Sequence, residues 1–157
     1  ANNNPESKGM GTTVVVALLT KDYLLYANVG DSSGFAMKNG HLLKVTKDHT
    51  LVQLLVQAGD ITEEEAKYHP KKNVLMKALG GEEDVIPDIY EVDMSFDAIL
   101  LSSDGLTNML SNESIENVLN DEDLTPEEKV VKLIRKCNAR GGTDNISVAY
   151  LVKESGE

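Results

Sequence analysis

The chain has 157 residues, enough for one domain, and its core must be aliphatic because it holds only two Phe, five Tyr and no Trp. The formal net charge of −11 argues against a nucleic-acid partner and against an anionic membrane surface, since both attract basic proteins. No apolar stretch is long enough to cross a membrane. The single cysteine, Cys137, allows no internal disulfide and favours a reducing, cytoplasmic compartment.

The first third of the chain predicts four β-strands, at residues 12–19, 23–29, 34–38 and 42–45. The first two are apolar, β-branched or aromatic runs joined by the short link at Lys21-Asp22. The other two flank Asn39-Gly40, a strong hairpin signal. We expect these strands to form a β-meander.

Residues 47–79 change character and predict a helical flap rather than core. Leucines with helical spacing precede Gly59, a natural C-cap, and Thr62 is followed by three glutamates as at a capped helix start. A further short helix is expected at 73–79. His49 is expected to position this flap rather than to bind a metal ion.

The last third predicts two helices between strands. The expected strands lie at 88–92, 98–102 and 145–152, and the helices at 112–119 and 125–138. In the second helix Thr125 serves as N-cap with Pro126 in the first turn. This order of elements favours an α+β fold with antiparallel sheets.

Three aspartates stand where a strand should meet a loop, each with a glycine one or two residues away. Asp31 follows the strand at 23–29, Asp104 follows 98–102, and Asp144 precedes 145–152. If the last two strands are antiparallel neighbours, Asp104 and Asp144 meet at one sheet edge, which Asp31 can also reach. Carboxylates without nearby cysteine or histidine are typical ligands of hard divalent cations. Asp-Gly pairs also occur in plain turns, so this pattern alone leaves both interpretations open.

Six motifs extend this pattern over nearly the whole chain. They are Gly9-Met10-Gly11-Thr12-Thr13, Gly30-Asp31-Ser32, Thr46-Lys47-Asp48-His49, His69-Pro70-Lys71-Lys72-Asn73, Ser103-Asp104-Gly105-Leu106-Thr107 and Gly141-Gly142-Thr143-Asp144-Asn145. Each is weak alone, but six in this order are specific. Together they resemble the metal-dependent serine/threonine protein phosphatases of the 2C type, in their bacterial form.

The resemblance implies an αββα sandwich of antiparallel sheets flanked by helices. It implies that Asp104 and Asp144 bind one of two Mn²⁺ or Mg²⁺ ions, and that Asp31 and Asp104 belong to a third site near the flap. A water bridging the two metal ions then hydrolyses phosphoserine and phosphothreonine in substrate proteins, without a protein nucleophile.

The chain also departs from this family. Residues 1–157 resemble the C-terminal two-thirds of the catalytic domain, and the N-terminal part, with its metal-bridging aspartate, is missing. The isolated chain is therefore expected to be a poor catalyst, and its unpaired sheet surfaces to pair with the missing part or with a second copy. Ser33 stands where Arg is usual, and Asn108 where some relatives have a third-site Asp. The alternative function is a non-catalytic pseudophosphatase, or a fragment that acts as a binding module.

Overall fold

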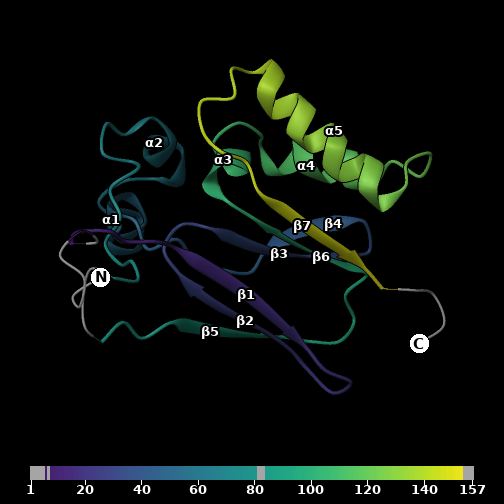
Figure 1. Ribbon diagram of the computed structural model, residues 1–157, viewed down its shortest axis with the longest axis horizontal. Coiled ribbons are helices and arrows are strands. Elements are labelled where there is room, and N and C mark those ends of the chain that lie inside the picture. The colour runs from purple at the N-terminus through teal and green to yellow at the C-terminus, as the bar shows by residue number, and fades with distance from the viewer. Residues whose placement is uncertain (1–5, 7, 81–83, 154–157) are drawn as a thin grey trace.

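Two antiparallel sheets lie face to face, and three helices cover the outer face of one of them (Figure 1). The computed structural model describes residues 6, 8–80 and 84–153. The three-stranded sheet has the order β1-β2-β5, and the four-stranded sheet has the order β4-β3-β6-β7. The strands are β1 (Val14–Leu19), β2 (Leu24–Val29), β3 (Ser33–Lys38), β4 (His41–Lys44), β5 (Asp88–Val92), β6 (Ala98–Ser102) and β7 (Val148–Val152).

The helices fall into two groups. Two short ones lie at the end of the sheets, and three lie against the four-stranded sheet (Figure 1). They are α1 (Leu51–Ala58), α2 (Glu63–Tyr68), α3 (Asp104–Thr107), α4 (Asn112–Leu119) and α5 (Pro126–Ala139). This is the predicted α+β arrangement of antiparallel sheets flanked by helices. Among the helices that the structure describes, none has the length and apolar character needed to cross a bilayer.

The core follows the alternation of side chains along the central strands. Phe35 and Leu100 face α3, α4 and α5, whereas their neighbours Ala36 and Ile99 face the three-stranded sheet. The first cluster also contains Ile115, Leu133 and Cys137 from the helices, so the helix layer and the sheet share one hydrophobic core. The second cluster fills the space between the two sheets.

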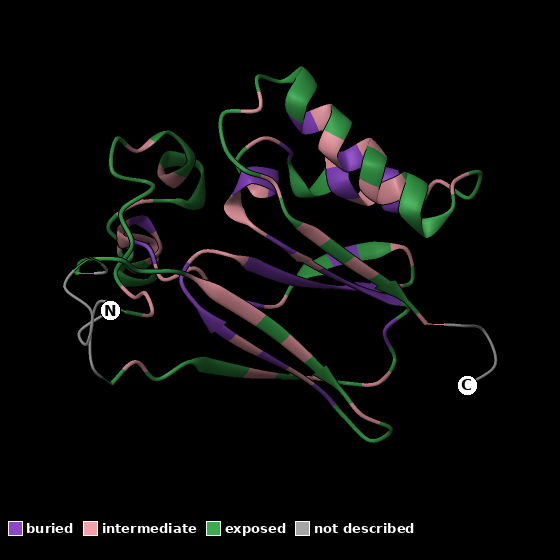
Figure 2. Cartoon of the chain, viewed as in Figure 1, coloured by how far each residue is buried: buried purple, intermediate pink, exposed green. Residues whose placement is uncertain are grey.

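The outer face of the three-stranded sheet is open to solvent in the described chain (Figure 2). Val16 and Ile89 both lie opposite Ala27 and are 46% and 60% exposed, and Leu18 is 51% exposed. The expected unpaired sheet face is therefore present. On its inner face the same sheet is well packed, because Leu24 and Tyr26 are completely buried.

Two local predictions were wrong. The first four strands do not form one meander, because β1 pairs with β2 in one sheet and β3 pairs with β4 in the other. The chain crosses between the sheets at residues 30–32. Residues 73–79 are not helical; they form isolated bridges between Thr50 and Leu75 and between Thr12 and Leu79. The backbone groups of this segment thus pair with distant parts of the chain instead of with one another.

Residues 47–80, called the two-helix segment below, contain α1 and α2. Thr50 caps α1, whose Gly59 end is left-handed (φ 80°), and Thr62 with Glu65 forms a capping box at α2. The end of the segment returns to its beginning, since Met76 N–H donates to the His49 carbonyl at 2.8 Å. The predicted C-cap at Gly59, the predicted capped start at Thr62 and the first two predicted helices of this region are therefore confirmed, and Thr50 is an N-cap that was not predicted.

Candidate metal centre

Asp104 and Asp144 come from two strands that lie side by side. β6 ends at Ser102, which pairs with Val148 at the start of antiparallel β7. Asp104 begins α3 directly after β6, and Asp144 lies in the loop that leads into β7. The predicted antiparallel pairing of these strands is confirmed, although β7 begins three residues later than expected.

Ser103 and Gly105 hold the two loops against each other. The Ser103 hydroxyl donates to the Asn145 carbonyl at 3.2 Å and accepts from Ser147 N–H at 3.0 Å. Ser103 N–H also donates to the Ser147 carbonyl at 3.0 Å. A Cβ atom on Gly105 would overlap the Asn145 carbonyl oxygen and lie 3.1 Å from its carbon. Only glycine therefore lets the Asp144 loop approach the start of α3 this closely.

Replacing Gly105 by Ala is expected to destabilise the chain by about 2 kcal/mol, because overpacking outweighs the gain in helix propensity. Urea unfolding of the two proteins measures this loss. Gly11→Ala is the matched control, since its nearest contact is the Leu79 carbonyl oxygen at 3.3 Å. If both substitutions cost the same, the close approach of Asn145 does not constrain this site.

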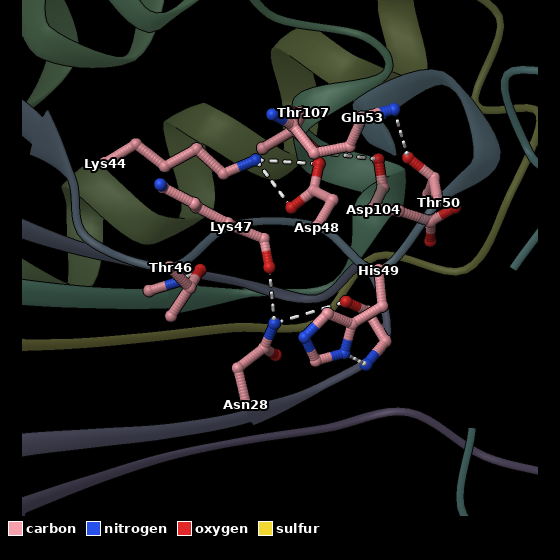
Figure 3. A network of polar contacts seen from close by, with 12 residues as sticks. Asn28, Lys44, Thr46, Lys47, Asp48, His49, Thr50, Gln53, Asp104 and Thr107 are labelled. Carbon is pink, nitrogen blue, oxygen red and sulfur yellow. Dashed lines mark hydrogen bonds and ion pairs between the residues drawn. The ribbon is translucent and has the colours of Figure 1, made fainter. Parts of the chain in front are cut away.

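Asp31 follows a glycine that is held from three sides. Gly30 has φ 104°, and a Cβ atom there would overlap the Thr13 side chain. The buried Asn28 side chain donates to the carbonyl oxygens of Gly30 (3.2 Å) and Lys47 (3.0 Å) (Figure 3). This network sets the direction in which the chain leaves β2 and therefore where Asp31 lies.

His49 joins the Asp31 loop to the two-helix segment. The backbone N–H of His49 donates to the Gly30 carbonyl at 2.9 Å. The ring atom Nδ1 accepts from the backbone N–H of Gly30 at 3.0 Å. Nε2 must therefore carry the proton of the neutral ring. Nε2 lies 3.2 Å from Asp88 Oδ2, which is within ion-pair distance. These contacts agree with the predicted positioning role of His49.

The predicted carboxylates are coupled through Asp104. Burial raises the pKa of Asp104, and the charge of Asp144 raises it further. Burial also raises the pKa of Asp31, with additional contributions from Asp104 and Asp48, whereas Lys44 opposes the shift. Like charges thus repel each other in two overlapping pairs, Asp31 with Asp104 and Asp104 with Asp144, and a bound cation would relieve this repulsion.

The donor chemistry fits a hard divalent cation, because the coupled groups offer only carboxylate oxygens. Among the described residues, however, no three His, Cys, Asp or Glu side chains are grouped closely enough to hold one metal ion. Each pair therefore supplies two carboxylates and leaves the remaining positions around an ion to water or other groups. Asn108 Nδ2 donates to Asp104 Oδ2 at 3.1 Å, so its amide orients Asp104.

A cleft of about 850 Å³ lies between the two-helix segment and the α3–α4 region. Asp31, Asp48 and Asp104 line it together with Glu63 and Tyr68 of α2. Asp144 is not among its lining residues. The Asp31–Asp104 pair is therefore open to a ligand that enters between the two parts.

Sequence reasoning missed Asp48 and Lys44 as members of this cluster. Lys44 Nζ lies 2.7 and 2.8 Å from the two carboxylate oxygens of Asp48 (Figure 3). Asp48 was noticed only as part of the motif Thr46-Lys47-Asp48-His49. Its spacing of four residues from Lys44 is informative in a helix but not in the extended segment that they occupy. Ser103 was noticed only as part of a motif, and its role as a clamp depends on a loop about forty residues away.

Comparison with known proteins agrees with these features. A model of the protein phosphatase 2C family matches residues 1–144. A serine/threonine phosphatase stp of Listeria monocytogenes is 41% identical over 155 residues, covering 98% of this chain and 61% of the relative. Protein phosphatase PhpP of Streptococcus pneumoniae is 39% identical over 145 residues, covering 92% of this chain and 58% of the relative.

A similar architecture is found in solved structures. The crystal structure of serine/threonine phosphatase Stp1 from Staphylococcus aureus superimposes with a TM-score of 0.93 at 35% identity, covering 98% of this chain and 61% of that one. The Mycobacterium tuberculosis serine/threonine phosphatase PstP/Ppp gives a TM-score of 0.85 at 35% identity, covering 98% and 65%. The chain thus spans less than two thirds of the length of these relatives.

Proposed function

Because the chain belongs to the protein phosphatase 2C family, we propose that the natural polypeptide containing it hydrolyses phosphoserine and phosphothreonine in proteins. The observation that carries this proposal is the coupled row of carboxylates Asp31, Asp104 and Asp144, two of which line an open cleft. The names of the relatives, which are serine/threonine phosphatases, support the same reaction. Phosphorylated proteins of the cytoplasm are the substrates that we propose.

Two carboxylate pairs have separate roles in this proposal. Asp104 and Asp144 would hold one Mn²⁺ or Mg²⁺ ion, and Asp31 with Asp104 would hold a further ion at the cleft. Metal ions bound at such sites supply a nucleophile by lowering the pKa of water and neutralise charge on the phosphoryl group. Ser103 and Gly105 keep Asp104 and Asp144 together, and Asn108 orients Asp104.

No protein nucleophile is required. Cys137 is completely buried between α5 and the four-stranded sheet, and burial raises the pKa of its thiol. A protonated, inaccessible thiol is a poor nucleophile. The cleft, with Glu63 and Tyr68 on α2, is where we propose that the substrate peptide lies, so the two-helix segment serves as the flap of this site.

The test is release of inorganic phosphate from a phosphothreonine peptide by the natural polypeptide that contains this sequence, with Mn²⁺ and with EDTA. We expect release with Mn²⁺ and none with EDTA. A phosphotyrosine peptide of the same sequence is the matched substrate and should be hydrolysed much more slowly. Hydrolysis that persists in EDTA, or no hydrolysis with either Mn²⁺ or Mg²⁺, would contradict the proposal.

A further inference from the structure

The chain segment 44–49 runs antiparallel beside residues 30–35. Lys44 pairs with Phe35 at the end of β4, and the N–H groups of Val45 and Thr46 both donate to the Gly34 carbonyl. His49 N–H donates to the Gly30 carbonyl at 2.9 Å. This pairing brings both Lys44 and Asp48 to the end of the sheet where the chain passes from Asp31 into β3.

The Lys44 ammonium group is fixed in this position. Nζ contacts both Asp48 oxygens, at 2.7 and 2.8 Å, and the two side chains are only 30% and 26% exposed. Figure 3 shows this ion pair together with Asp104. Partly buried charges are screened much less by salt than exposed ones, so the ammonium acts on its surroundings over several ångströms.

Acidic side chains outnumber basic ones among the residues that line the cleft. Asp31, Asp48 and Asp104 all line the cleft, and each carries a negative charge when ionised. Lys44 Nζ contacts Asp48, which lines the cleft together with Asp31 and Asp104, so its positive charge lies beside this cluster. Lys44 thus already offsets part of the repulsion that a divalent cation would otherwise neutralise.

We propose that Lys44 is a built-in counter-cation that weakens the binding of a divalent metal ion by Asp31 and Asp104. Held by Asp48, it stabilises the carboxylates in the absence of metal and repels an incoming cation. This role rests on the proposed function, because it assumes that the Asp31–Asp104 pair binds the metal ion. Lys44 therefore helps to set the metal concentration at which the Asp31–Asp104 pair is occupied, together with the two ligands themselves.

The test is direct Mn²⁺ binding, with free Mn²⁺ measured by electron paramagnetic resonance. Lys44→Gln is expected to tighten the weaker Mn²⁺ site about three- to tenfold, the size expected for removing one nearby charge at intermediate dielectric. Asp48→Asn should weaken it, because it removes an anion and frees the ammonium to turn toward Asp31. Lys44→Arg, which keeps the charge, should bind as the unaltered chain does.

Lys132→Gln is the matched control. Lys132 also pairs with an aspartate, Asp121 at 2.7 Å, but it lies on α5 away from the cleft, and its loss changes the net charge equally. Its Mn²⁺ binding should not change. If the Lys44–Asp48 ion pair had only a structural role, Lys44→Gln and Asp48→Asn would change Mn²⁺ binding in the same direction. The counter-cation role predicts opposite directions.

The outcomes separate this inference from the proposed function. Unchanged or weaker binding in Lys44→Gln overturns the counter-cation role while leaving the metal site intact. If Asp31→Asn does not weaken Mn²⁺ binding at any site, the Asp31–Asp104 pair does not bind the metal ion. That result overturns both the assignment of this pair and the present inference. Tighter binding in Lys132→Gln as well would show that net charge, not the position of Lys44, sets the affinity.

Discussion

Replacing Asp104 by Asn is expected to abolish Mn²⁺-dependent phosphate release by the natural polypeptide and, at the same time, to stabilise the metal-free fold. Asp104 is the member shared by both carboxylate pairs, so its loss removes a ligand from each. We expect a fall in kcat of more than about 100-fold, since even the loss of a residue that only orients a metal ligand costs up to that much. Assays across a range of Mn²⁺ concentrations measure it.

The gain in stability follows from the direction of the pKa shift. Burial and Asp144 raise the pKa of Asp104 in the folded state, so its ionised form costs stability when no cation is bound. Stability associated with this group is present below the pKa of the unfolded chain and is lost as pH rises through the folded pKa. The Asp104→Asn variant avoids this loss, because its amide does not ionise. It should therefore melt higher near neutral pH and no higher at acidic pH.

Asp121→Asn is the matched control for this stability effect. The ion pair with Lys132 lowers the pKa of Asp121, the opposite direction, so its replacement should lower the melting temperature near neutral pH. A metal-free Asp104→Asn chain that melts lower than the unaltered chain would show that Asp104 is not strained by its neighbours. Full activity of the variant would remove Asp104 from the metal centre.

Gly30→Ala is expected to destabilise the fold by roughly 3 kcal/mol, more than any other substitution considered for this chain. About 1–2 kcal/mol comes from forcing alanine into the left-handed region at φ 104°, and the rest from overlap with the Thr13 side chain. Because Asp31 follows directly, the displacement should also weaken Mn²⁺ binding. Urea unfolding and Mn²⁺ titration measure the two effects.

Gly59→Ala separates the two causes. Gly59 has φ 80°, but a Cβ atom there would have no heavy atom within 4 Å. It should cost only about 1 kcal/mol, the backbone term alone. If Gly30→Ala and Gly59→Ala lower the free energy of unfolding equally, the chain relaxes around Thr13. The tight crossing between the sheets would then not determine the position of Asp31.

The elements with strong local signals could be predicted from the sequence. The strand at Ala98–Ser102 and the helix at Asn112–Leu119 were predicted with the bounds that the structure has. Their hydrophobic spacing and caps depend on neighbours in the chain, and antiparallel pairing of β6 with β7 followed from their order. The approach of Asp104 toward Asp144 could therefore be predicted as well.

What could not be predicted depends on contacts between distant residues. The change of sheet at residues 30–32 looks like an ordinary tight turn in the sequence, and only the packing of Thr13 and His49 on Gly30 distinguishes it. Residues 73–79 have apolar spacing compatible with a helix, but pairing of Leu75 with Thr50 keeps them extended. Lys44 and Asp48 likewise come close to Asp31 only because their segment pairs beside β3 and the residues before it.

The two-helix segment is fastened at both of its ends, and this has a mechanical consequence. Leu51 N–H donates to the Val74 carbonyl at 2.9 Å, while Thr12 and Leu79 exchange two hydrogen bonds of 3.0 and 2.9 Å. These hydrogen bonds close the two-helix segment at its base, and Asp31 lies outside it. A displacement of α1 and α2 would therefore change the opening of the cleft without moving the backbone that carries Asp31.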